Sequence, residues 1–279
     1  MIFTWIPFYK EFAEKLLQFQ TDRKKLLKLI YNNRATLLVD YLHDEGGKDD
    51  LFTDIDPFTT FGIFNRSVKK RIRYAKLFKK LLNISADVPS DFVGIPVLDN
   101  RKSHFFGFKR DREDNDIDNL WNLFVKVVKK KNFENEYNKV IRQYAIRVNI
   151  TMALFWIRPE DFLAFDSTNR AYLKEQYGVI LPNKAPEYSE YMSILDDIKA
   201  KMKKGVIKEK TFYELSANAN NGTLDEAELT WYDDVVHIWE RRKNVVLYGA
   251  PGTGKTYDVP EFAVRLCDPA FMAAEPSRE

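Results

Sequence analysis

The sequence predicts a mainly helical, α+β N-terminal region followed by the first βα unit of a P-loop α/β domain. Three observations support this prediction. Apolar residues recur at helical spacing over most of residues 1–205. Residues 206–223 end in a run of Asn and Gly that is typical of a linker. Residues 224–279 contain a short apolar segment followed by a glycine-rich phosphate-binding motif, which together open a parallel sheet.

The first third of the chain is predicted to be a series of helices. Pro7 suits the first turn of a helix, where its missing N–H is not needed. The apolar residues after it keep helical spacing as far as Tyr31. We expect a further helix over 36–42 and an acidic loop over 49–57. An amphipathic helix should follow within 66–82, with an apolar face formed by Val68, Ile72, Ala75, Phe78 and Leu82.

The middle of the chain alternates loops and helices. Gly and Pro in 88–100 indicate a loop or short strands. Asp114, Asn115 and Asp116 are residue types that cap a helix N-terminus, and the helix they open should close at the lysines 129–131. Further helices are expected over 133–148, the stretch that follows the Asp166–Ser167 cap, and 188–202. The strongly apolar segment 150–157 is either a buried helix, which we favour, or a strand. Residues 1 to about 205 should therefore fold without the rest of the chain.

The C-terminal part begins after the best linker candidate, Asn218–Gly222. A helix over 226–242 leads into Asn244–Tyr248, which has the composition of a short buried strand. The residues that follow the phosphate-binding motif contain acids, but none of these acids comes after an apolar strand. We therefore expect residues 224–279 to be the opening of a nucleotide-hydrolysing domain, from a truncated gene or a fragment, without hydrolysis of their own.

Residues 249–256 match the phosphate-binding pattern G-x-x-x-x-G-K-[ST] directly after the predicted strand. Glycines let the backbone turn tightly and bring its N–H groups onto phosphate oxygens. Lys255 would place its charge on the β/γ-phosphates, and the Thr256 hydroxyl suits coordination of Mg²⁺. The alternative is a strand-to-helix turn that binds nothing. We predict that ATP or GTP binds with Mg²⁺ through Gly249, Ala250, Pro251, Gly252, Thr253, Gly254, Lys255 and Thr256.

Composition argues against several classes of protein. The single cysteine, Cys267, excludes an internal disulfide framework and a cysteine zinc site, and it suits a reducing cytoplasm. The three histidines show no metal-ligand spacing, and no catalytic Ser/His/Asp or Cys/His set is recognisable. There is no signal-peptide pattern and no apolar run near the ~20 residues of a membrane span. We expect a cytoplasmic protein that does not bind membranes.

The segment 66–82 contains eight cationic residues and no acidic residue. Its commoner interpretation is an ordinary amphipathic helix with a solvated basic face. The functional interpretation is a helix whose basic face contacts the phosphate backbone of DNA. In that case we expect the contacts to come from Lys69, Lys70, Arg73 and Lys76. The net charge of +3 gives no global attraction to nucleic acid, so any such binding would be local.

A second candidate for nucleic-acid contact is the aromatic stretch 105–108, which basic residues flank on both sides. Exposed aromatic rings beside cations can stack on bases. Aromatic residues buried in a strand are more frequent, and we favour that interpretation.

The segment 244–257 resembles the Walker A region of McrB-type AAA+ proteins, the nucleotide-driven subunits of modification-dependent restriction systems. Tyr257, directly after the motif, belongs to this resemblance and joins the nucleotide-binding residues. Upstream, 3–9, 54–58 and 155–159 resemble the N-terminal regions attached to such motors.

This resemblance implies an ATPase or GTPase subunit that self-associates into rings and works with a McrC-like nuclease subunit. It also implies an N-terminal region that recognises DNA or another target. The Walker B acids, sensor residues and arginine finger of the family are not present in this sequence, so the resemblance extends only to nucleotide binding. The alternative function is a stand-alone DNA- or protein-binding module with a vestigial P-loop.

Overall fold

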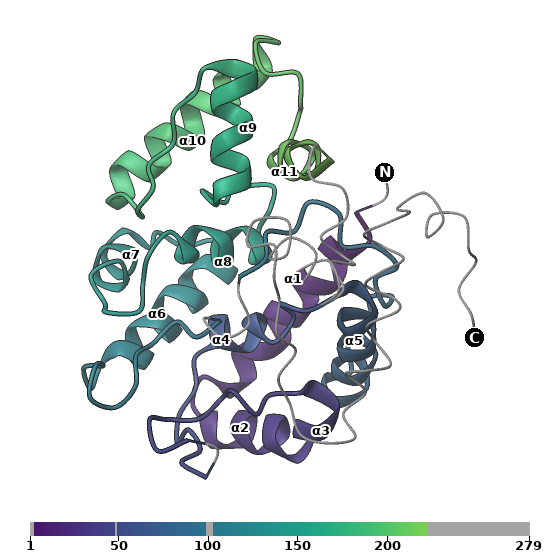
Figure 1. The fold of residues 1–279 in the computed structure, drawn as a ribbon, viewed down its shortest axis with the longest axis vertical. Helices are drawn as coiled ribbons and strands as arrows, with labels where there is room; N and C mark the ends of the chain where they lie inside the picture. The colour runs from purple at the N-terminus through teal and green to yellow at the C-terminus, as the bar shows by residue number, and fades with distance from the viewer. Residues whose placement is uncertain (1–2, 48, 99–102, 222–279) are drawn as a thin grey trace, which may run out of the picture. The chain divides into compact units, whose positions relative to one another are not determined.

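The computed structural model describes residues 3–47, 49–98 and 103–221. These residues belong to the first of two compact units, Met1–Leu224, and the second unit is Asp225–Glu279. The described part is mainly helical, as the sequence predicts, but it contains no strand, so the β part of the predicted α+β character is wrong for these residues. A lone antiparallel bridge joins His43 to Leu51. The helical elements, shown in Figure 1, are α1 Trp5–Leu16, η1 Leu17–Phe19, α2 Arg23–Asn32, α3 Arg34–Leu37, α4 Pro57–Gly62, α5 Val68–Leu82, α6 Asp116–Val128, α7 Glu134–Val140, α8 Asn149–Ile157, α9 Ser167–Tyr177, α10 Tyr188–Lys203 and α11 Phe212–Asn221.

Helix α1 lies at the centre of the larger cluster of helices, between α5 and α8 (Figure 1). Its Trp5 ring lies 5.8 Å from Phe155 of α8, and its Phe12 ring lies 5.0 Å from Phe78 of α5. Every residue of α8 is buried, which explains why this helix shows no polar face in the sequence. The buried aromatic rings on α1, α4, α5 and α8 form one continuous core.

Helices α9, α10 and α11 form the upper part of the unit in Figure 1. Helix α11 packs against α9, and three side chains before and within it are buried: Ile207, Phe212 and Leu215. Ser216 of α11 donates a hydrogen bond of 2.7 Å to the carbonyl oxygen of Gly94. The backbone at Gly94 has φ +76°, and a Cβ there would lie 2.8 Å from the backbone nitrogen of Ala217, so this close approach requires glycine.

Several predicted boundaries differ from the structure. The helix expected over 36–42 ends at Leu37, because Leu38 takes a left-handed conformation with φ +53°. The helix expected over 133–148 is α7, which ends at Val140. The expected acidic loop ends at Asp56, since Pro57 begins α4.

The aromatic stretch 105–108 also differs from the prediction. Phe105 and Phe106 are buried, as we favoured, but residues 103–109 form no strand. The predicted linker 206–223 contains helix α11 in its described part, where Asn218 and Asn220 are helical. The packing of α11 on α9 places these residues in the same unit as the helices before them.

Among the described residues, no helix combines the length and apolar character needed to cross a bilayer. The same residues contain no group of three His, Cys, Asp or Glu side chains placed to hold a metal ion.

Candidate nucleic-acid interface

Helix α5 presents one face to the core and the opposite face to solvent. Its buried positions are Arg71, Tyr74, Ala75, Phe78 and Leu82, which follow the i, i+3, i+4, i+7 spacing of a helix face. Val68 and Ile72, which the sequence assigned to the apolar face, are only partly buried. The helix ends at Asn83, whose φ of 51° is left-handed and stops the helical hydrogen bonding.

One of the eight cations in the basic segment, Arg71, is buried and so does not belong to its exposed surface. Arg71 Nε donates to the carbonyl oxygens of Phe64 at 3.0 Å and Arg66 at 2.7 Å. Its guanidinium lies 5.4 Å from the centre of the Phe92 ring. Arg71 therefore holds the turn before α5 and is not available to a ligand.

Four cations of α5 form an outward stripe, defined here as Lys69, Arg73, Lys76 and Lys80. They are spaced by 4, 3 and 4 residues, so they lie on one side of the helix, opposite the buried face. Lys70 is exposed beside this stripe. All four predicted DNA contacts, Lys69, Lys70, Arg73 and Lys76, are thus exposed and lie together. Within the part of the chain that the structure describes, none of them forms an ion pair.

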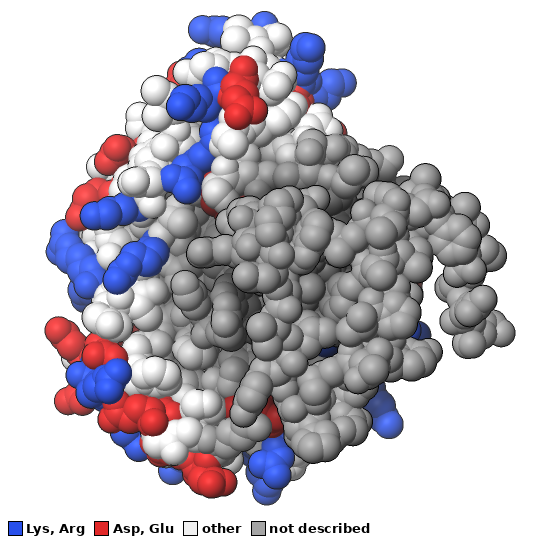
Figure 2. All heavy atoms as spheres, viewed as in Figure 1, with Lys and Arg blue, Asp and Glu red and all other residues white. Residues whose placement is uncertain are grey.

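The face of the molecule shown in Figure 2 carries a mixture of charges. Basic and acidic side chains are interspersed over its described part. The stripe on α5 carries one sign of charge, which is the local pattern expected of a surface that contacts phosphates.

A cluster of two arginines and two tyrosines lies beside the N-terminal half of the stripe. The Arg66 guanidinium lies 4.8 Å from the centre of the Tyr41 ring, and that of Arg73 lies 5.7 Å from the centre of the Tyr74 ring. Arg66 donates to the carbonyl oxygens of Asn65 and Leu38, at 3.1 and 3.3 Å. Arg73 donates to the carbonyl oxygen of Thr36. These contacts attach the start of α5 to the turn after α3.

The two tyrosine hydroxyls of this cluster are buried and have no hydrogen-bond partner in the described residues. Burial raises the pKa of Tyr41 to about 12, although nearby Arg66 lowers it. Burial also raises the pKa of Tyr74, against the opposite effect of Arg66 and Arg73. Both hydroxyls therefore keep their protons at neutral pH and remain hydrogen-bond donors.

The aromatic stretch does not supply a second contact surface of the expected kind. Phe105 and Phe106 are buried at 0% and 1% exposure. Phe105 contacts Phe58 of α4, and Phe106 contacts Phe52. Two of the rings that we considered for base stacking thus belong to the core, in agreement with the interpretation that the sequence favours.

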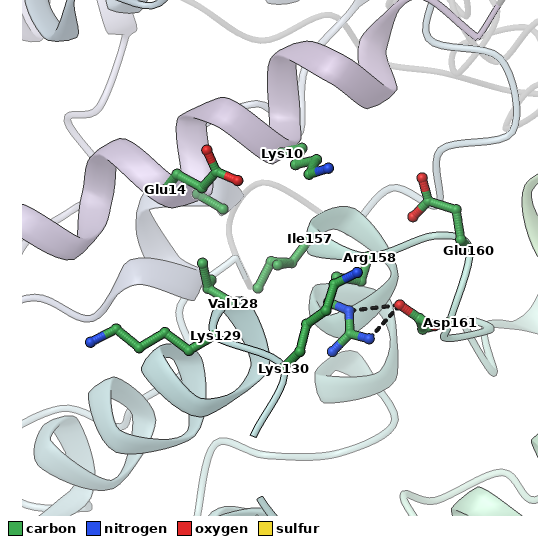
Figure 3. Close-up of a pocket in the computed structure, with 10 residues that line it drawn as sticks. Lys10, Glu14, Val128, Lys129, Lys130, Ile157, Arg158, Glu160 and Asp161 are labelled. Atoms are coloured by element: carbon green, nitrogen blue, oxygen red, sulfur yellow. Dashed lines mark hydrogen bonds and ion pairs between the residues drawn. The ribbon is translucent and has the colours of Figure 1, made fainter. Parts of the chain in front are cut away.

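A surface cleft of about 490 Å³ lies between α1 and the C-terminal ends of α6 and α8 (Figure 3). Lys10 and Glu14 of α1 face Lys130 and Arg158 across it. Arg158 is already engaged, because its Nε donates to Asp161 at 2.7 Å and its Nη1 to the Val127 carbonyl at 3.1 Å. The lining mixes both signs of charge, so it favours no single class of ligand.

Two carboxyl groups with raised pKa values lie directly before helices. Asp56 accepts hydrogen bonds from the backbone nitrogens of Phe58 and Thr59 and so caps α4. Asp166 precedes α9. Burial raises the pKa of each to about 6, against the opposite effect of local backbone hydrogen bonds. Neither carboxyl group lines the cleft.

The predicted nucleotide site, 249–257, and the strand before it lie outside the described residues. Sequence reasoning found the exposed cations of α5 but missed Tyr41 and Tyr74. Tyr74 had a usable signal, since it keeps helical spacing with Arg71 and Phe78. Tyr41 had none, because its position depends on the turn after α3.

The family model described as "Domain of unknown function (DUF8425)" matches residues 5–222, which is most of the chain. The chain belongs to this family. The DUF8425 match spans α1 to α11 and ends before the phosphate-binding motif. Neither a curated protein nor a solved structure matches the chain.

Proposed function

We propose that this chain is a nucleotide-binding subunit of the McrB-like AAA+ type, in which residues 249–257 bind ATP or GTP with Mg²⁺. The observation that supports this proposal is the complete motif at 249–256, preceded by an apolar segment. The DUF8425 unit then acts as the target-recognition part. Self-association and a McrC-like nuclease subunit belong to the same proposal through the resemblance of 244–257.

Nucleotide binding is tested with the full chain and fluorescent ATP and GTP analogues, with and without Mg²⁺. Lys255→Ala should abolish binding, because it removes the charge placed on the β/γ-phosphates. Thr256→Ala should chiefly reduce the part of the affinity that depends on Mg²⁺. Nucleotide binding that is unchanged in both variants would refute the assignment of the motif.

We further propose that the DUF8425 unit binds DNA through α5. The supporting observation is the exposure of Lys69, Lys70, Arg73 and Lys76 on adjoining faces of one helix, away from the core and without ion pairs in the described residues. Cations placed in this way can neutralise backbone phosphates and release counterions. Such contacts position a protein on DNA and do not read its sequence.

The DNA proposal is tested by fluorescence anisotropy with methylated and unmethylated duplexes at low salt. Reversing the charge of the four contact residues to Glu should weaken binding to both duplexes about equally. A matched control reverses four exposed lysines near the end of α10, Lys203, Lys204, Lys208 and Lys210, and should bind much more like the unaltered chain. Equal losses in the two variants would show that only net charge matters. No binding by the folded, unaltered chain would leave the stripe as an ordinary solvated face.

A further inference from the structure

We propose that His104 is the centre of a pH-sensitive closure, which holds the segment 41–52 against the segment 103–112 at neutral pH and releases it in mild acid. The closure does not depend on the proposed nucleotide or DNA binding. His104 belongs to the second segment, and its ring contacts two aromatic rings of the first. It stacks on Tyr41 with the ring centres 6.0 Å apart, and it meets Phe52 edge-on at 5.9 Å.

Further contacts hold the two segments together. The backbone nitrogen of Lys109 donates to the Asp44 carboxylate at 2.8 Å, and the rings of Phe52 and Phe106 lie 4.8 Å apart. Three acidic side chains of the first segment pair with cations of the second: Asp44 with Arg112 at 3.1 Å, Asp50 with Lys109 at 3.4 Å and Glu45 with Arg110 at 3.5 Å. These carboxylates are thus engaged elsewhere and do not compensate a charge on the His104 ring.

The surroundings of His104 suit the neutral imidazole only. Its Nε2 atom is buried and has no hydrogen-bond partner among the described residues, so a proton placed there would be a donor without an acceptor. Burial and the nearby His43 lower the pKa of His104, against a hydrogen bond to the Tyr41 backbone, which raises it. The Arg66 guanidinium, 4.8 Å from the centre of the Tyr41 ring, already places a positive charge in the same cluster.

The sign of the pH dependence follows from the lowered pKa. When the two segments separate, the ring enters water and titrates near its ordinary pKa of about 6.5. The closed state binds the proton more weakly, so the stabilisation of the closure is fully present above pH 6.5 and is lost as the pH falls below it. For one group that stays neutral when closed, lowering the pH from 7.5 to 5.5 raises the open fraction about tenfold, which is the upper limit.

Asp56 titrates in the same range with the opposite sign. It reaches the second segment through Thr59, whose hydroxyl oxygen accepts from the backbone nitrogen of Phe105 at 2.9 Å. The closure is therefore measured in the Asp56→Asn background, which removes this titration. Burial raises the pKa of three tyrosines near the contact, which stay protonated throughout: Tyr31, Tyr41 and Tyr74.

The test is amide hydrogen exchange of the full chain, followed by mass spectrometry at pH 7.5, 6.5 and 5.5. The variant His104→Phe keeps an aromatic ring and removes the titration, and comparison at equal pH cancels the intrinsic exchange rates. Relative to this variant, exchange in 41–52 and 103–112 should rise several-fold, and at most about tenfold, as the pH falls from 7.5 to 5.5. A ratio that does not change with pH would overturn the inference, and so would an equal rise in α9 and α10.

His43→Gln is the matched control, because it removes the neighbouring imidazole and leaves His104 in place. Most of the pH dependence should persist in this variant. If the pH dependence instead disappears here and persists in His104→Phe, the closure does not titrate through His104 and the inference fails.

A second measurement holds even where His104→Phe does not fold. The sequence contains three histidines, so His43→Gln/His237→Gln leaves His104 alone to give an imidazole Hε1 signal in proton NMR. This signal should titrate with a midpoint below pH 6.5, together with the onset of exchange in 41–52. A midpoint at or above 6.5 would contradict a neutral ring in the closed state.

Discussion

Asp56 provides the sharpest prediction about stability. This carboxyl group is fully buried and accepts hydrogen bonds of 2.7 and 3.0 Å from the backbone nitrogens of Phe58 and Thr59. It also accepts one from the Thr59 hydroxyl, whose oxygen in turn accepts from the backbone nitrogen of Phe105 at 2.9 Å. Loss of solvation raises the pKa of Asp56 to about 6, against the opposite effect of these bonds. Folding therefore shifts the protonation equilibrium of Asp56 toward the protonated form.

The sign of the pH dependence follows from this direction. Because the pKa is higher in the folded than in the unfolded state, the native protein binds the proton more tightly. The resulting stabilisation is fully present below pH 4 and is lost as the pH rises through 6. The shift from 3.8 to about 6 corresponds to about 3 kcal/mol between these limits. The substitution Asp56→Asn keeps an acceptor for the capped nitrogens and removes the titration.

The assay is urea unfolding of both proteins at pH 4, 5, 6 and 7. The difference in unfolding free energy should move in favour of Asp56→Asn by about 2.4 kcal/mol as the pH rises from 4 to 7, because part of the full shift lies outside this interval. Asp22→Asn removes a capping carboxylate from an exposed position on α2 and serves as the control. Parallel curves for the unaltered chain and Asp56→Asn would refute the assignment of a raised pKa to this carboxyl group.

Three further predictions follow from the packing and from the charges. Ending the chain at residue 205 removes the buried side chains of Ile207, Phe212 and Leu215, a loss of roughly 5–9 kcal/mol. Calorimetry should therefore show a cooperative transition for residues 1–224 and none for residues 1–205, contrary to the expectation from the sequence that residues 1 to about 205 fold alone. Equal transitions would contradict the packing of α11. Gly94→Ala places a Cβ against Ala217 at φ +76°, and it should lower the unfolding free energy by at least about 1 kcal/mol, measured by urea titration. An unchanged midpoint would show that α11 does not hold this position. Four phosphate contacts from α5 predict that DNA affinity falls on the order of a hundredfold between 50 and 200 mM salt. A salt-insensitive affinity would exclude these contacts.

The sequence by itself determined the long helices of the described region. Helices α1, α5 and α6 were predicted because a repeated apolar spacing over twelve or more residues is a local property that packing reinforces. The exposure of Lys69, Lys70, Arg73 and Lys76 followed from the same spacing, since residues opposite an apolar face point to solvent.

The tertiary structure decided the short helices and the cluster beside α5. Short helices are marginal alone and depend on their neighbours, so an Asn-rich segment typical of a linker becomes α11 when Glu209 accepts from Asn218 and Ser216 bonds to Gly94. Tyr41 reaches Arg66 because Leu38 ends α3 in a left-handed conformation. Contacts between residues far apart in the chain leave no periodic signal in the sequence, which is why packing alone shows which charges and hydroxyls meet.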